Sequence, residues 1–212
     1  MEFKSPKSLS QLTMITLFLL IFACIIDIFF EFKTISTLNN LANLNVEQLN
    51  QFKHQQTIFH GLHSFYLLIF WVFFMLWIFR YSKNTHYLSN KYLKYTPGWT
   101  VGYFFIPIVN FFRPHQAISE LYFENTKFNS RKLVNWWWAT WIYSTVILRV
   151  VNTITKRTND IDLIKSLGYT DICTYLVRII CYILLLKMMM IMNSKQLEWS
   201  IELEPKSTSK AL

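Results

Sequence analysis

The chain has 212 residues, of which 53% are hydrophobic, 18% aromatic and only 16% charged, and it carries a formal net charge of +9. A soluble domain of this length would need a larger share of charged residues on its surface. The basic residues flank apolar runs and do not form one basic face, which argues against nucleic-acid binding and suits an anionic lipid surface. The composition therefore predicts a single membrane domain, over residues 12–204.

The chain begins with a short basic segment, residues 1–11, and four apolar segments follow in order. They run from about 12–32, 57–79, 134–154 and 172–192, close to the ~20 residues that a helix needs to cross a bilayer. The first segment contains Asp27 and Glu31 and has no small-residue cleavage pattern, so we expect an uncleaved span and not a signal peptide. The stretch 33–56, rich in Leu, Asn and Gln, is predicted to be a helical external extension.

The distribution of lysine and arginine predicts the orientation of these spans. They are concentrated near the N-terminus, in the connection between the second and third segments, and near the C-terminus. The positive-inside rule then places both termini in the cytoplasm, with 205–212 as a disordered tail. The tryptophans 136–138 and 141 at the start of the third segment fit the cytoplasmic headgroup level. The three cysteines (Cys24, Cys173 and Cys181) lie in apolar stretches without paired spacing, so neither disulfides nor a metal or other cofactor is predicted.

The second and third segments are joined by an unusual apolar stretch, TPGWTVGYFFIPIVNFFRP. Breakers at Pro97, Gly98, Gly102 and Pro107 make it too interrupted for a simple span, yet it is too apolar for a solvated loop. We expect a re-entrant or interfacial segment over 97–114. A short amphipathic helix over 114–128 is predicted to follow it on the inner membrane surface. The predicted fold is thus an all-α integral membrane protein with four transmembrane helices and these two additions.

Ionisable residues in the predicted spans are costly to bury and need partners or a path to water. Depth along the helices, at 1.5 Å per residue, places Asp27, Glu31, His60, His63 and Arg178 together in the outer half of the membrane. This cluster could relay protons, bind a divalent metal or recognise a charged solute. The alternative is a structural ion pair between Asp27 and Arg178, with the two histidines at the headgroup interface.

The sequences FFMLWIFRYSKNTHYL (73–88) and YTPGWTVGYFFIPIVNFFRPHQAISELY (95–122) resemble domain-of-unknown-function family 4328 of bacterial multi-span membrane proteins. The matching positions are Trp77, Arg80, Asn84, Pro97, Gly98, Trp99, Pro107, Asn110, Arg113, Pro114 and Glu120, and Trp137 and Trp138 also fit. The resemblance covers about 57–192 and implies a location in the bacterial cytoplasmic membrane. It implies no activity.

The resemblance supports a second polar group around the interrupted segment, on the cytoplasmic side. Its members are Arg80, Asn84, Trp99, Asn110, Arg113 and Glu120. Asn and Arg side chains could brace irregular backbone by hydrogen bonds to its N–H and C=O groups. Alternatively, Arg80 and Arg113 could face a pocket that binds an anionic headgroup, phosphate or carboxylate.

The sequence has no nucleophile elbow, phosphate-binding glycine loop or H-E-x-x-H motif, which disfavours an enzyme. We expect a non-enzymatic scaffold, sensor or accessory component that contacts the lipid bilayer, including anionic headgroups, and forms a homo-oligomer or binds a membrane protein partner. The alternative is an oligomeric transporter or channel for a small anionic solute, because broken helices often line such paths.

Overall fold

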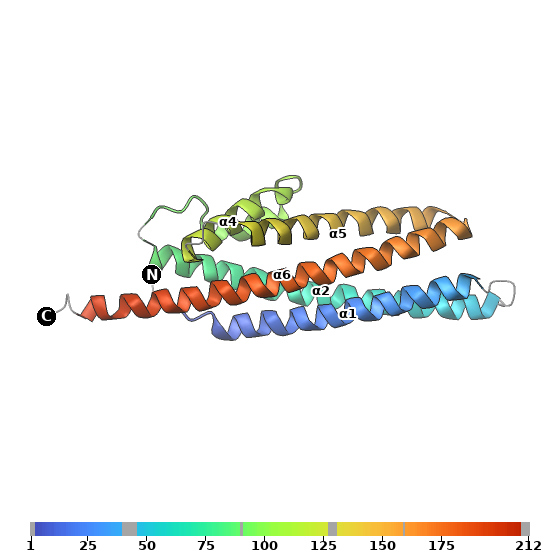
Figure 1. Ribbon diagram of the computed structural model, residues 1–212, viewed down its shortest axis with the longest axis horizontal. Helices are drawn as coiled ribbons and strands as arrows, with labels where there is room; N and C mark the ends of the chain where they lie inside the picture. The colour runs from blue at the N-terminus through green and yellow to red at the C-terminus, as the bar shows by residue number, and fades with distance from the viewer. Residues whose placement is uncertain (1–2, 40–45, 90, 127–130, 159, 209–212) are drawn as a thin grey trace. The chain divides into compact units, whose positions relative to one another are not determined.

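The computed structural model describes residues 3–39, 46–89, 91–126, 131–158 and 160–208, some of them, including His60, by their backbone alone. These described residues form helices and turns, and no strand is found among them. The expected all-α fold is therefore confirmed. Figure 1 shows the helices in chain order, from blue to red.

Four long helices contain the four predicted apolar segments: α1 (Lys7–Asn39), α2 (Val46–Leu88), α5 (Lys132–Arg157) and α6 (Ile161–Thr208). Within the described residues, three stretches are long and apolar enough to cross a membrane: α1, Gly61–Leu88 of α2 and Asp162–Glu202 of α6. Helix α5 has 26 residues, which is long enough, but its amphipathic tryptophans and Arg149 make it less apolar. The chain has the helices of a membrane protein, and the fourth span stays a prediction.

The segment between α2 and α5 is broken into short helices. They are α3 (Pro97–Gly102), η2 (Tyr103–Phe105), η3 (Val109–Phe111) and the longer α4 (Arg113–Thr126). Thr96 caps α3, its hydroxyl accepting a hydrogen bond from Trp99 N at 3.5 Å, and Pro97 suits the first turn because it has no N–H to leave unpaired. The predicted interruptions are present. How deeply the segment enters the membrane stays a prediction.

Ile108 has a backbone conformation that is rare for an isoleucine. Its φ is 67° and its ψ −52°, and Val109 N donates to Pro107 O at 2.7 Å. This is a γ-turn with positive φ, a strained conformation that glycine adopts more readily than a β-branched residue. The turn separates η2 from η3 and directs a largely exposed side chain outward.

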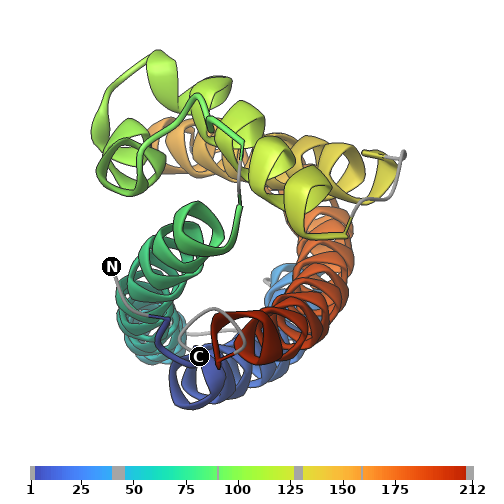
Figure 2. The same ribbon diagram turned by 90° about the vertical axis from the view of Figure 1, so that its left-hand side faces the viewer.

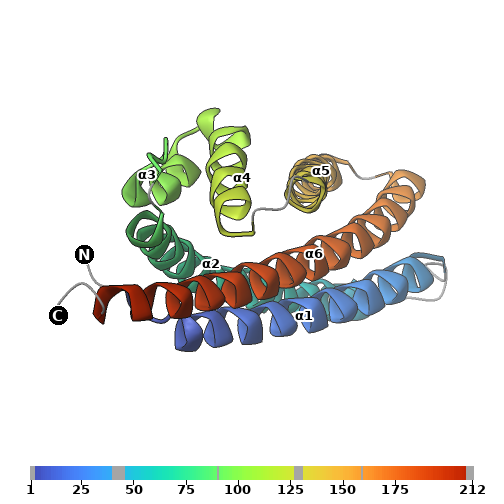
Figure 3. The same ribbon diagram turned by 60° about the vertical axis from the view of Figure 1, so that its left-hand side comes forward.

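The contacts divide the chain into two compact units, and each long helix contributes to both. Unit 1 comprises residues 1–15, 70–138 and 183–212. Figure 2 views it with the long helices nearly along their axes and α4 across them, and Figure 3 shows α3 beside the end of α2. Its core contains Phe74, Trp77, Tyr81, Ile118, Leu121, Met188, Met189 and Met192.

Helix α4 corresponds to the predicted amphipathic helix, whose last residues, 127–128, lie outside the described part. Its apolar residues Ala117, Ile118 and Leu121 are buried inside the protein. The face expected to lie on lipid is thus used largely for packing within unit 1.

Unit 2 comprises residues 16–69 and 139–182. Gly168 of α6 allows a close approach to α1, because a Cβ at this position would lie 3.2 Å from Ile35 Cγ1. In the predicted extension 33–56, the residues up to Asn39 and from Val46 onward are helical, and residues 40–45 lie outside the described part. The predicted tail 205–212 falls on the end of α6 and on residues 209–212, which also lie outside it, and stays a prediction.

Candidate functional site

Four buried polar side chains form a continuous hydrogen-bond network in unit 1: Asn84 and Thr85 of α2, Asn125 of α4 and Gln196 of α6. Asn84 Nδ2 donates to Gln196 Oε1 at 3.1 Å. Gln196 Nε2 lies 3.2 Å from Thr85 Oγ1 and 3.4 Å from Asn125 Oδ1. Asn125 Nδ2 also donates to Thr85 Oγ1 at 2.8 Å. Because each of their side-chain polar atoms has a partner, the network can be buried without an orphaned group.

Further hydrogen bonds tie this network to the backbone of distant segments. Asn84 Nδ2 donates to Lys4 O at 2.8 Å, and Lys4 N donates back to Asn84 Oδ1 at 3.3 Å. Beside the network, Tyr81 OH donates to Met192 O at 3.0 Å, and Trp77 Nε1 donates to the side-chain oxygen Oδ1 of Asn193 at 3.1 Å, so both also join α2 to α6. Asn84, selected from the sequence, thus joins the start of the chain to α2 and α6.

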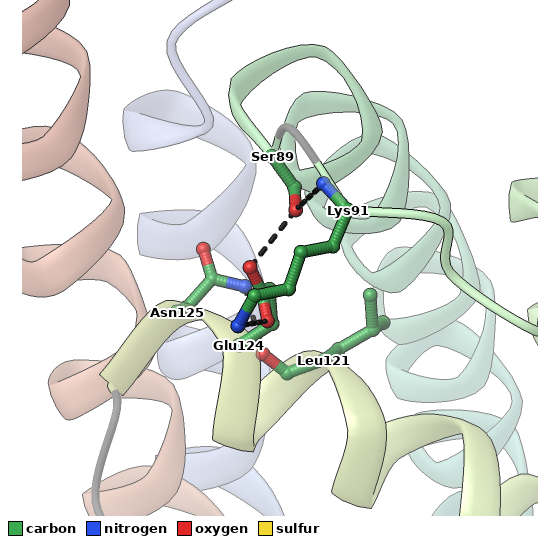
Figure 4. Close-up of polar contacts among 5 residues, drawn as sticks. All are labelled: Ser89, Lys91, Leu121, Glu124 and Asn125. Atoms are coloured by element: carbon green, nitrogen blue, oxygen red, sulfur yellow. Dashed lines mark hydrogen bonds and ion pairs between the residues drawn. The ribbon is translucent and has the colours of Figure 1, made fainter.

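Two glutamates of α4 hold the connection that follows α2. Glu120 accepts hydrogen bonds from Lys94 N at 2.9 Å and from Tyr95 N at 3.3 Å. Glu124 accepts from Ser89 Oγ at 2.9 Å and forms an ion pair with Lys91 Nζ at 3.6 Å (Figure 4). Glu120 therefore satisfies backbone donors of the connection before Pro97, whereas bracing of the interrupted segment by Asn and Arg side chains stays a prediction.

The other predicted members of the inner group do not converge on one point. Arg113 Nη1 donates to Gln116 Oε1 at 3.2 Å and approaches Tyr95 OH at 3.4 Å. The Trp99 ring is half-exposed and stacks on Tyr103, with centroids 5.3 Å apart. Asn110 Oδ1 is buried and has no hydrogen-bond partner in the described part of the chain.

Arg80 is half-buried, and the described residues provide no ion-pair partner within 4 Å of it. No contact between Arg80 and Arg113 is observed among the described residues, so an anion bound by both stays a prediction.

The outer group lies in unit 2, where Asp27 and His63 meet. His63 Nδ1 is 2.6 Å from Asp27 Oδ2, and both side chains are buried, with 8% and 3% of their surface exposed. The ligand atoms of Cys24, Asp27 and His63 all lie within 4.8 Å of one another. These three residues are thus the set that could hold a metal ion.

The remaining residues of the predicted outer group are Glu31, Arg178 and His60. Glu31 is buried. Among the described residues, Arg178 forms no ion pair within 4 Å with Asp27. The side chain of His60 lies outside the described part. The ion-pair partner of Asp27 in the structure is therefore His63, not Arg178.

Sequence reasoning missed Thr85, Asn125, Gln196 and Cys24 as members of these groups. Gln196 and Asn193 are three residues apart on one face of α6, a polar pair that follows the apolar part of this helix. Cys24 and Asp27 have the same spacing on α1. Two polar residues three positions apart on an apolar helix are the sequence signal that indicates both the network of unit 1 and the cluster of unit 2.

The long apolar helices and the buried polar groups between them define an all-helical membrane protein. The chain belongs to the family described as Domain of unknown function (DUF4328), whose sequence model matches residues 41–194. The resemblance noted from the sequence is thereby confirmed. Comparison with curated proteins and with solved structures gives no match.

Proposed function

We propose that this protein is a non-enzymatic scaffold, sensor or accessory component of a bacterial cytoplasmic membrane, with both termini in the cytoplasm. We propose further that the segment 97–112 contacts lipid. One observation carries this proposal: the short helices of that segment expose large apolar side chains. Phe105 and Ile108 are 73% and 74% exposed, and Trp99, Phe111 and Phe112 are also exposed.

The energetics favour a lipid environment for these side chains. Removing an Ile or Phe side chain from water contributes about 1.5–3 kcal/mol. Phe105 and Ile108 together would therefore contribute several kcal/mol on entering the headgroup and acyl boundary. The strained turn at Ile108 supports the same proposal. Glycine would adopt this backbone conformation more easily, yet the chain has an isoleucine there, with its apolar side chain exposed.

Basic and aromatic residues adjoin this apolar surface. Lys94 Nζ lies 5.6 Å from the centroid of the Tyr95 ring, and Arg113 approaches the Tyr95 hydroxyl. Basic residues close to an anionic membrane surface contribute about 1 kcal/mol each. Anionic headgroups are therefore the lipid class that we propose this side of the segment meets.

The exposed apolar face of α1 supports contact with lipid or with partner helices. Phe18, Phe22, Phe29 and Phe32 are all exposed and recur at helical spacing. Such a surface suits a second copy of the chain or another membrane helix. This is the reason for preferring a scaffold or accessory role to a soluble-ligand receptor.

Site-directed spin labelling of the full chain in anionic liposomes tests the lipid contact. Labels at Phe105→Cys and Ile108→Cys, in a Cys173→Ser background, should collide more often with oxygen than with a water-soluble nickel chelate. The matched control is Tyr92→Cys, a position that is 94% exposed in the preceding loop and should show the opposite preference. If positions 105 and 108 behave like position 92, the segment is in water and the proposal is wrong.

The accessory role is tested separately, by identifying proteins that co-purify with the chain in mild detergent and by measuring solute flux in liposomes. A defined membrane partner or homo-oligomer is expected. Flux of a small anion that Arg113→Ala abolishes would contradict the accessory role and support a transporter or channel.

A further inference from the structure

Cys24, Asp27 and His63 form a compact set of metal-ligating side chains inside unit 2. Cys24 and Asp27 are three residues apart on one face of α1, and His63 reaches them from α2. All three are buried, and Cys24 is fully so. Thiolate, carboxylate and imidazole are the three side-chain types that bind zinc and related ions in proteins.

Three buried polar atoms of this set make no hydrogen bond in the described part of the chain, and two of the three face each other as an ion pair. Asp27 Oδ2 and both ring nitrogens of His63 are buried and have no hydrogen-bond partner in the described part of the chain. Asp27 Oδ2 and His63 Nδ1 are 2.6 Å apart, yet their relative orientation does not make a hydrogen bond. His63 Nε2 has neither a hydrogen bond nor an ion-pair contact in the described part of the chain. A buried polar atom without a partner costs about 1–3 kcal/mol, so this nitrogen points to a group that binds the histidine.

We propose that Cys24, Asp27 and His63 bind a divalent transition-metal ion, with Zn²⁺ as the best match. The hard ions Mg²⁺ and Ca²⁺ prefer oxygen ligands, so a thiolate ligand disfavours both of them. The mixed set of sulfur, nitrogen and oxygen ligands suits Zn²⁺ or Co²⁺. This proposal is independent of the lipid contact of segment 97–112.

Charge balance favours such an ion at this depth in the protein. A cysteine thiolate and an aspartate carboxylate together carry two negative charges, which a divalent cation neutralises, while the imidazole binds as a neutral ligand. The bound site would therefore have no net charge in a region where uncompensated charge is costly. A simple Asp27–His63 ion pair would leave Cys24 without any part in the cluster.

The spacing is compatible with tetrahedral coordination after a small adjustment. Bond lengths of about 2.0–2.3 Å place neighbouring ligand atoms about 3.2–3.7 Å apart. The ligand atoms lie within 4.8 Å of one another, so a separation at that limit would close by about 1 Å. If His63 binds through Nδ1, its distance of 2.6 Å to Asp27 Oδ2 would open by roughly 0.6 Å or more. Three protein ligands leave the fourth position for water or another donor, an arrangement found in zinc sites that act on a ligand.

Metal content and cobalt spectroscopy test the site in the full chain, purified in detergent with a tag that contains no histidine. We expect about one Zn²⁺ per chain by elemental analysis, consistent with one three-ligand site. Co²⁺ loaded in place of Zn²⁺ should give a thiolate-to-cobalt charge-transfer band. Cys24→Ser and His63→Ala should lose both signals.

Loss of metal in Cys24→Ser or His63→Ala could also result from misfolding, so a variant that keeps all three ligands is needed as well. In the double variant Cys173→Ser/Cys181→Ser, Cys24 is the only remaining cysteine, since the chain has three. A cobalt–thiolate band in this variant assigns the sulfur ligand to Cys24 directly. The control substitution His115→Ala, at a half-buried histidine of unit 1, should keep the metal.

Each outcome is decisive. Absence of the cobalt–thiolate band in the double variant, when it is monodisperse and helical by circular dichroism, would overturn the proposal. So would Zn²⁺ that remains stoichiometric in both Cys24→Ser and His63→Ala. A chain that binds neither ion at micromolar concentrations would leave Asp27 and His63 as an ion pair only.

Discussion

Replacing Asn84 by leucine tests whether the buried network in unit 1 stabilises the protein. Leucine keeps a similar volume but removes both donors and the acceptor. Lys4 is exposed, so its backbone groups can turn to water, whereas Gln196 Oε1 is left buried with no donor. An unsatisfied buried acceptor costs about 1–3 kcal/mol, so the free energy of unfolding should fall by that amount.

The double variant Asn84→Leu/Gln196→Leu makes this prediction sharper. Gln196→Leu alone orphans Asn125 Oδ1, which receives its hydrogen bond from Gln196, and should cost a similar amount. In the double variant the oxygen orphaned by Asn84→Leu no longer exists. The double variant should therefore lose about as much as Gln196→Leu alone, and clearly less than the sum of the two.

Equilibrium unfolding in mixed micelles, followed by circular dichroism, measures these differences. The matched control is Asn152→Leu, an exposed asparagine on α5 that should change the unfolding free energy by less than about 0.5 kcal/mol. Strict additivity of the two network substitutions would refute the reasoning. The same holds if Asn84→Leu is no more destabilising than the control.

Three further substitutions probe the backbone of the protein. Ile108→Gly should be about 1 kcal/mol more stable than Ile108→Ala, because both lose the isoleucine side chain but only glycine adopts the positive φ of the γ-turn without strain; equal stabilities would contradict this. Gly168→Leu should lower the free energy of unfolding by about 1–3 kcal/mol and by more than Gly168→Ala does, because even a Cβ at this position would lie 3.2 Å from Ile35. Equal unfolding midpoints for the two variants would argue against the close approach. Glu120→Ala should speed trypsin cleavage after Lys94 several-fold relative to Glu120→Gln, since it leaves two backbone donors unpaired, and equal cleavage rates would show that Glu120 does not hold the loop.

The apolar runs and the breakers between them were sufficient to predict the helices and the interruption after α2. Both follow from local physics, because span length and the conformational limits of Pro and Gly act over a few residues. Whether α5 crosses the membrane is harder to predict, since the tryptophans near its start and Arg149 lower its apolar character without excluding a span. The fourth crossing therefore remains a prediction.

The partners of the polar residues were harder to predict because they are distant in sequence. Asn84 pairs with Lys4 and Gln196, which are 80 and 112 residues away. Depth arithmetic placed Asp27, His63 and Arg178 at one level of the membrane. It fixes height along a helix but not direction around its axis, so it could not choose between His63 and Arg178 as the partner of Asp27.

The two polar groups differ in one respect that separates structure from binding. In the network of unit 1, the amides and hydroxyl saturate one another, so an added ligand would have to displace existing hydrogen bonds. In the cluster of unit 2, buried atoms of Asp27 and His63 lie beside a thiol with no such bonds among the described residues. Burial of unsatisfied donors and acceptors is unfavourable unless something completes them. The residues most suited to a ligand are therefore those of the cluster, even though the family motif includes Asn84 of the network.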